Sequence, residues 1–298
     1  MTMSRENIGV MAAVASAALG GIASGTTRFV IGATDPVTLG VFRYGVGFLL
    51  LLPLAFMLKS RWPARKDWPA VVGLGLMFFF AFSVMFNLAY SYTTAARGAL
   101  TLSTMPLMTM AAAAVLGIER LTARKTLGVL IAFAGVAGAL LFDLSNAPPG
   151  AWRGEAIMAG ATFLMSLYNV WSRPYIARSD PLAFVTVGMG AAGLGLFVWA
   201  LLIGGFDAVK DFHAPQWIAV GYLGVIGAAL VFFLWSFALG RTTPTKTAVT
   251  ITVNPVFASA VGALAIGEAI GINLIVGLIA VGAGILLATT GAPAKDTR

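Results

Sequence analysis

The chain has 298 residues, of which 59% are hydrophobic and only 10% are charged, and its mean hydropathy is +0.92. A soluble domain carries about 25% charged residues, so this composition argues against a soluble enzyme and against a disordered chain. The net charge of +8 is no sign of nucleic-acid binding, because basic loops on one membrane face give the same excess. The composition predicts a polytopic membrane protein.

Ten apolar runs follow one another along the chain. A helix needs about 20 mostly apolar residues to cross the hydrocarbon core of a bilayer. The predicted spans are 7–31, 36–58, 68–92, 98–118, 122–142, 154–177, 181–203, 215–239, 245–266 and 271–290. These runs are too long and too continuously apolar for the strands of a membrane barrel. The sequence therefore predicts an all-α integral membrane protein with ten transmembrane helices.

The basic residues predict the orientation of these helices. If the amino terminus is cytoplasmic, most of the 19 Lys and Arg fall in cytoplasmic loops, few lie outside, and Arg43 lies within a helix. This bias matches the positive-inside rule. An even number of spans then places both termini in the cytoplasm.

The two halves of the chain resemble each other. A shift of 149 residues aligns residues 89–141 with the second half, and a shift of 145 aligns the first span of each half. The first shift pairs Arg97 with Lys246, Pro106 with Pro255 and Glu119 with Glu268. The second pairs Gly9 with Gly154, Arg28 with Arg173 and Asp35-Pro36 with Asp180-Pro181. We interpret residues 1–146 and 147–298 as two five-helix repeats of one integrated membrane domain.

An odd number of helices per repeat has a consequence for topology. The second repeat must enter the membrane from the opposite side, which relates the two repeats by a pseudo-two-fold axis in the membrane plane. In transporters built from inverted repeats of this kind, the shared site lies near the bilayer midplane, and the arrangement can supply both an outward-open and an inward-open state. A duplicated scaffold without a transport role is the alternative.

Several of these residues resemble the drug/metabolite transporter superfamily, in particular its ten-helix EamA type. The resemblance rests on Leu116-Gly-Ile-Glu119-Arg-Leu-Thr and the glycine-rich run that follows, on Ile266-Gly-Glu268, and on Pro106 and Pro255. Arg43 matches an arginine in the second helix of that family, although its counterpart in the other half is Gly188. As a whole the chain is similar to bacterial amino-acid exporters of the YddG type. The resemblance implies a bundle around a central cavity, a bacterial inner-membrane location and neutral or aromatic amino acids as substrates.

Arg43 lies several residues inside its apolar run. A basic side chain at a helix centre costs about 2.5–3.5 kcal/mol on insertion scales, so it should face the bundle interior, water or a partner. A counter-charge for a substrate carboxylate or a gate is one interpretation. A structural role, with hydrogen bonds to helix-end carbonyls or snorkelling to the interface, is the other.

Aromatic residues recur on single faces of three runs and have polar neighbours. The residues predicted on this basis to line a substrate cavity are Phe82, Asn87 and Tyr90 in the third run, Tyr168 and Trp171 in the sixth, and Trp235 in the eighth. Aromatic walls with a few polar groups suit a neutral amino acid. Ordinary packing or an interfacial aromatic belt remains the alternative.

Polar residues on two further runs complete the predicted site. Ser24 in the first run and Asn254 in the ninth are candidate substrate ligands, with close helix packing as the alternative. Pro106 and Pro255 each remove a hydrogen bond within a helix. We predict that they act as hinges for gating, although prolines also occur in static membrane helices.

The sequence gives little support for catalysis or for a bound cofactor. There is no cysteine and a single histidine, His213 in a polar loop, so neither a metal site nor a cofactor is expected. Glu119 and Glu268 lie at helix ends, where caps are more common than proton carriers. We therefore predict a facilitated exporter of neutral, in particular aromatic, amino acids that acts on a small molecule in the lipid bilayer without an obligate protein partner. Proton-coupled drug or metabolite efflux is the alternative, and an intramembrane enzyme is a distant one.

Overall fold

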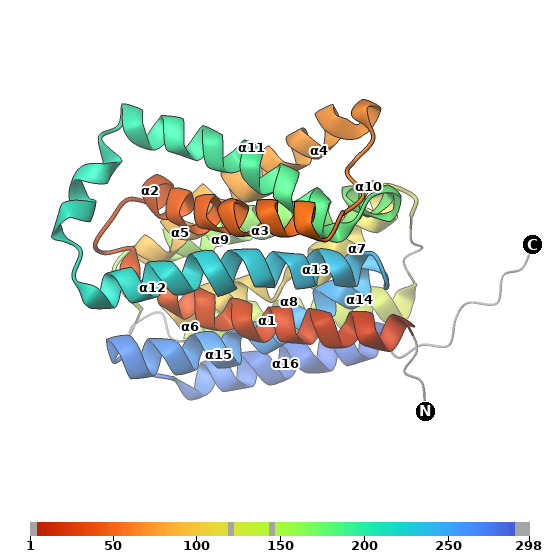
Figure 1. Cartoon of the computed structure of the whole chain (residues 1–298). Helices are drawn as coiled ribbons and strands as arrows, with labels where there is room; N and C mark the ends of the chain where they lie inside the picture. The colour runs from red at the N-terminus through yellow and green to blue at the C-terminus, as the bar shows by residue number, and fades with distance from the viewer. Residues whose placement is uncertain (1–4, 119–121, 143–146, 290–298) are drawn as a thin grey trace, which may run out of the picture.

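The computed structural model describes residues 5–118, 122–142 and 147–289, and Glu119 lies outside these ranges. Within them the secondary structure is helical and no strand occurs. Figure 1 shows the long helices lying side by side along one common direction, with most of their ends gathered at two opposite ends of the bundle. The predicted all-α fold is confirmed.

The helices of the first half lie where the first five spans were predicted. They are α1 (Arg5–Val30); α2 (Pro36–Gly40), η1 (Val41–Gly45) and α3 (Val46–Met57); η2 (Arg65–Asp67), α4 (Trp68–Gly75), η3 (Leu76–Phe82) and α5 (Ser83–Tyr92); α6 (Ala95–Leu102) and α7 (Met105–Val115); and α8 (Ala123–Phe142).

The second half follows the same order. Its helices are α9 (Ala151–Trp171) and α10 (Arg173–Arg178); α11 (Pro181–Leu202); η4 (Gly205–Asp211), α12 (Ala214–Gly224), η5 (Val225–Leu230) and α13 (Val231–Leu239); α14 (Pro244–Val249), η6 (Thr250–Val253), α15 (Asn254–Val261) and η7 (Gly262–Ile266); and α16 (Ile272–Thr289).

Seven continuous helical stretches among the described residues are long and apolar enough to cross a membrane. The other three predicted spans correspond to α8, α9 and α16. Helices α8 and α16 contain shorter apolar segments, and α9 has Arg153 and Glu155 close to its start. Helices therefore occupy most of each of the ten predicted ranges among the described residues, and the chain is an all-α membrane protein.

The first helix of each half packs against helices of the other half. Helix α1 contacts α13 and α15, whereas α9 contacts α5 and α7. Two glycines allow the close approach. A Cβ atom at Gly9 would lie 2.9 Å from the Cβ of Arg241, and one at Gly154 would lie 2.6 Å from the carbonyl oxygen of Ala89. Because the first helices are exchanged in this way, the two halves form one packed unit.

Helices α8 and α16 pack against each other in antiparallel orientation. Near the start of α16, Asn273 Nδ2 donates to the carbonyl oxygen of Ala139 near the end of α8, at 2.8 Å. Near the start of α8, Arg124 Nε donates to the carbonyl oxygen of Leu287 near the end of α16, at 3.0 Å. Each helix thus starts where the other ends.

Four helical stretches contain a π-helical segment. The segments η1 and η3 lie in the second and third stretches, and η5 and η7 lie in the eighth and ninth. A π turn inserts one extra residue and changes which face the following residues present, and such turns are frequent at functional sites. Segments η1 and η3 contain residues of the candidate site described below, and η5 directly precedes others.

Candidate functional site

A cavity lies inside the bundle between residues of α1, η1, η3, α5, α6, α9, α13, η6 and α15. Its volume is about 40 Å³, which is room for a few water molecules. Small-molecule sites have volumes of about 300–1,000 Å³, so this cavity must widen before it can hold a substrate. Its polar lining residues are Ser16, Ser24, Arg43 and Asn254. Its aromatic lining residues are Phe82, Phe86, Phe232 and Trp235.

Arg43 is the charged residue of this cavity, and its side chain is 3% exposed. The π turn of η1 carries it. Nη2 donates to the carbonyl oxygen of Gly227 in η5 at 3.1 Å, and Nη1 approaches Thr27 Oγ1 at 3.4 Å. Nε is buried without a hydrogen-bond partner. Among the described residues no carboxylate pairs with this guanidinium, so none of them neutralises its charge.

Aromatic rings surround the guanidinium. The Arg43 Cζ atom lies 5.3 Å from the ring centre of Phe86 and 5.9 Å from that of Phe232. Rings within about 6 Å attract a cation through their negative faces. Phe82 and Phe86 stack with their centres 5.3 Å apart. The site therefore combines a positive charge with a continuous apolar wall.

Hydrogen bonds fix the remaining walls. Ser16 Oγ donates to the carbonyl oxygen of Val231 at 2.8 Å, and Ser24 Oγ lies 3.3 Å from Asn254 Oδ1. Trp235 Nε1 donates to Asn169 Oδ1 at 2.9 Å. Because a buried indole N–H needs an acceptor, Asn169 holds the Trp235 ring in place.

Five of the nine predicted substrate residues line the cavity, namely Ser24, Arg43, Phe82, Trp235 and Asn254. The other four lie elsewhere. Asn87 is buried and donates from Nδ2 to the carbonyl oxygen of Pro36 at 2.9 Å. Tyr90 is buried behind the cavity with its ring 5.0 Å from that of Phe86. Trp171 is 41% exposed at the end of α9.

Helix geometry explains these displacements. Each residue advances by about 100° around an α-helix. Within α5, Asn87 is therefore turned about 100° from Phe86, the cavity-lining residue of that helix. Tyr90 is turned only about 40° from Phe86 and lies one turn further along the helix. Trp171 is turned about 120° from Met165, the residue of α9 that lines the cavity, and its side chain is exposed.

Tyr168 packs behind the aromatic wall of the cavity, on Phe78, whose ring also contacts those of Phe82 and Phe232. Its ring stacks on that of Phe78 at 4.2 Å and meets that of Phe79 edge-on at 6.1 Å. Gly188, which occupies the position corresponding to Arg43, packs against Phe79.

The sequence did not single out the lining residues Leu102, Met165, Val231 and Ile251. Aliphatic residues of this kind occur on every side of a membrane helix, so no signal in the sequence distinguishes them. By contrast, the spacing in the sequence already groups Phe86 with Phe82, Phe232 with Trp235, and Ser16 with Ser24, and all six residues line the cavity.

The two prolines lie at helix breaks. Pro106 is near the start of α7, after the turn that follows α6, and Pro255 is near the start of α15, after η6. Thr104 Oγ1 donates to the carbonyl oxygen of Thr101 at 2.8 Å, which satisfies one acceptor exposed at the first break. Each proline therefore lies just after an interruption, in the fourth or the ninth helical stretch, and their role as hinges stays a prediction.

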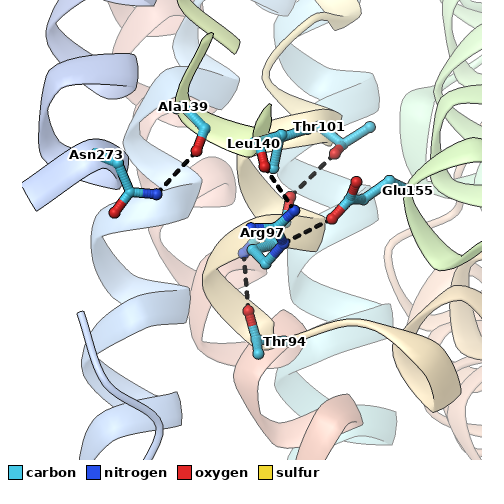
Figure 2. A network of polar contacts seen from close by, with 7 residues as sticks. All are labelled: Thr94, Arg97, Thr101, Ala139, Leu140, Glu155 and Asn273. Atoms are coloured by element: carbon cyan, nitrogen blue, oxygen red, sulfur yellow. Dashed lines mark hydrogen bonds and ion pairs between the residues drawn. The ribbon is translucent and has the colours of Figure 1, made fainter. Parts of the chain in front are cut away.

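Ion pairs join the helices at the end of the bundle where α6 and α9 begin. Figure 2 shows Arg97 between Glu155 and the end of α8. Arg97 Nε lies 2.6 Å from Glu155 Oε1, and Nη2 donates to the carbonyl oxygen of Leu140 at 3.0 Å. Both side chains are largely buried, 3% and 13% exposed.

Glu268 makes a second contact at the same end. Its Oε1 lies 3.0 Å from Arg28 Nε, and its Oε2 accepts from the backbone N–H of Ala95 at 2.8 Å, at the first residue of α6. The interpretation of Glu268 as an end cap agrees with this geometry.

No metal-binding group of three or more His, Asp or Glu occurs in the described part of the chain. His213 is exposed and begins α12. In the preceding loop, Lys210 donates a hydrogen bond to Asp207, and this bond together with the lysine charge lowers the pKa of that carboxyl. These groups are separate from the cavity.

Membrane-length helices around an internal cavity define a polytopic helical membrane protein. The chain belongs to the EamA-like transporter family, whose model matches residues 7–141 and 152–290. It is 22% identical to the uncharacterized transporter YyaM of Bacillus subtilis over 88% of this chain and 87% of that protein. It is 30% identical to an uncharacterized protein of Pseudomonas aeruginosa, over 86% of this chain and 84% of that one.

Two further similarities are informative. A probable terminal-alkyne amino-acid exporter of Streptantibioticus cattleyicolor is 24% identical over 77% of this chain and 76% of its own. A solved crystal structure of a protein with 20% identity superimposes with a TM-score of 0.69 over 96% of both chains. The second match shows the fold alone. The names of the relatives indicate transport.

Proposed function

We propose that the protein is a secondary transporter that exports neutral, in particular aromatic, amino acids across the bacterial inner membrane by alternating access. The observation that carries this proposal is the internal cavity, in which the unpaired guanidinium of Arg43 lies beside the rings of Phe82, Phe86, Phe232 and Trp235. A carboxylate can bind the guanidinium while an aromatic side chain packs on the rings. The relative named as an amino-acid exporter supports the substrate class.

Two inverted repeats, residues 1–146 and 147–298, would supply the two access states. The antiparallel packing of α8 and α16, the last helix of each repeat, supports this arrangement because equivalent helices of inverted repeats run in opposite directions. The reciprocal exchange of α1 and α9 supports it as well. Both termini would then lie in the cytoplasm.

Ion pairs at the two ends suggest how access could alternate. At the end predicted to be external, Arg97–Glu155 is buried. At the opposite end, Lys246 pairs with Glu6, and these side chains are 53% and 48% exposed. Each pair joins the fourth helix of one repeat to the first helix of the other. The buried pair would keep the external end closed, and the breaks before Pro106 and Pro255 would let the fourth and ninth helices bend.

Facilitated export fits the site better than proton coupling. None of the described residues lining the cavity is acidic. The carboxylates of Glu155 and Glu268 are each paired with an arginine. These acids therefore suit a structural role more than a proton carrier, and the substrate gradient would drive export.

Counterflow in proteoliposomes tests the proposal. Vesicles loaded with unlabelled L-phenylalanine should accumulate external labelled L-phenylalanine without an imposed proton gradient, and the flux should saturate. Trp235→Ala should raise the KM by about tenfold, whereas Lys66→Gln in an exposed loop should behave as the natural protein. Flux that requires a proton gradient would refute facilitated export, and the absence of saturable flux would refute the transport function.

A further inference from the structure

We propose that the cavity recognises its substrate through the carboxylate alone, and that it accepts monocarboxylates with an apolar side chain whether or not they carry an amino group. This inference rests on the proposed function and concerns the chemical class of substrate. The observation behind it is an imbalance of charge. The cavity presents one guanidinium, and no acidic residue is among the described residues that line it.

The donors of the cavity suit an anion. Arg43 Nε is buried without a partner, and its two other nitrogens bond only a backbone carbonyl and a hydroxyl group. Burying a charge without a counter-ion costs free energy unless a ligand supplies the opposite charge. A substrate carboxylate supplies both the missing charge and the acceptors, because guanidinium and carboxylate form charge-assisted hydrogen bonds.

The acceptors of the cavity do not suit an ammonium group. Asn254 Oδ1 is approached by the Ser24 hydroxyl, and Ser16 Oγ is bonded to Val231. The carboxylates of Glu155 and Glu268 lie outside the cavity and are paired with Arg97 and Arg28. An ammonium group would therefore enter a site that already holds a positive charge and would find only neutral hydroxyl and amide oxygens.

The inference has an electrical consequence. A zwitterion carries no net charge, whereas a monocarboxylate carries one negative charge out of the cell. A membrane potential of 100 mV, negative inside, changes the equilibrium ratio of a monovalent ion by about 50-fold. Export of an amine-free acid would thus be driven by the potential, without a proton carrier in the protein.

Three analogues of one shape separate the contributions of the two charged groups. They are 3-phenylpropionate, which keeps the carboxylate; phenethylamine, which keeps the amine; and 3-phenylpropionamide, which is neutral. Binding to the purified full chain is measured by ligand-induced thermal stabilisation, with L-phenylalanine as reference. We expect 3-phenylpropionate to bind within about threefold of L-phenylalanine, and the amine and the amide at least about tenfold more weakly.

Arg43→Gln should remove the preference for the acid over the amide, Arg43→Lys should keep part of it, and Lys66→Gln should leave it unchanged. If the Arg43 variants do not fold, the affinities of the three analogues relative to L-phenylalanine, measured on the natural protein, test the proposal. In vesicles, a potassium diffusion potential should accelerate the flux of 3-phenylpropionate and leave that of L-phenylalanine unaltered.

The outcomes distinguish the two proposals. Phenethylamine binding as tightly as the acid, or the acid binding tenfold more weakly than L-phenylalanine, would overturn carboxylate-only recognition even if L-phenylalanine is transported. Tight binding and potential-driven flux of 3-phenylpropionate without any L-phenylalanine flux would support the inference and refute amino-acid export.

Discussion

Glu155→Gln removes the negative charge that faces the buried guanidinium of Arg97. The two side chains are 3% and 13% exposed, and 2.6 Å separates Arg97 Nε from Glu155 Oε1. A second arginine nitrogen, Nη1, already lacks a hydrogen-bond partner. After the substitution, the main remaining anchor of Arg97 is the carbonyl oxygen of Leu140. The variant therefore leaves a positive charge in a largely dry contact between helices.

The expected cost is large because the desolvation of Arg97 is no longer offset. Removing one partner of a buried ion pair destabilises proteins by about 3–5 kcal/mol. We expect a value near 3 kcal/mol, since the Gln carbonyl can still accept one hydrogen bond. The matched control is Glu6→Gln, which removes the partner of Lys246 in the exposed pair. Exposed pairs contribute at most about 1 kcal/mol.

Thermal and denaturant unfolding of the purified protein in one detergent, followed by tryptophan fluorescence, measures both variants. The double variant Arg97→Met/Glu155→Leu should recover most of the stability, because apolar residues can replace a buried pair at little net cost. Equal losses in Glu155→Gln and Glu6→Gln, or a loss under about 1 kcal/mol for Glu155→Gln, would show that burial does not set the strength of this pair.

Three further predictions follow from the packing. Gly154→Ala should destabilise the protein by about 1–3 kcal/mol in the same assay, because its Cβ would lie 2.6 Å from a main-chain oxygen of α5. A Cβ atom at Gly221 would have no neighbour within 4 Å, so Gly221→Ala should be neutral or slightly stabilising. Similar losses of stability in Gly154→Ala and Gly221→Ala would disprove the steric argument. Asn169→Ala should raise the KM for L-phenylalanine about tenfold, because the Trp235 indole loses its acceptor, and an unchanged KM would contradict this. Trp171→Ala should leave the KM within about twofold of the natural value because its side chain lies outside the cavity; a rise equal to that of Trp235→Ala would place it on the substrate path.

The sequence by itself determined the class of the protein and its helices. Apolar runs of about 20 residues are sufficient evidence for membrane helices, since lipid cannot satisfy backbone polar groups. The helix breaks near Pro106 and Pro255 could be predicted because proline lacks the backbone N–H that a helix interior needs. The interior position of Arg43 could be predicted because exposing a charge to lipid costs free energy.

Only the tertiary structure decided which side chains of these helices face the cavity. In a soluble helix the apolar face marks the core, but a membrane helix is apolar on the lipid side as well, so periodicity loses this information. The π turns of η1, η3 and η5 shift the facing residues further. Tyr168 shows the consequence, because its ring stacks on Phe78 while Trp235 lines the cavity.

The charge pairs were decided by the same long-range packing. Arg97 and Glu155 are 58 residues apart, and Arg28 and Glu268 are 240 residues apart. Their pairing depends on α9 lying against the first half and α1 against the second. Spacing along a helix predicts contacts within that helix, whereas contacts between distant helices depend on how the helices pack.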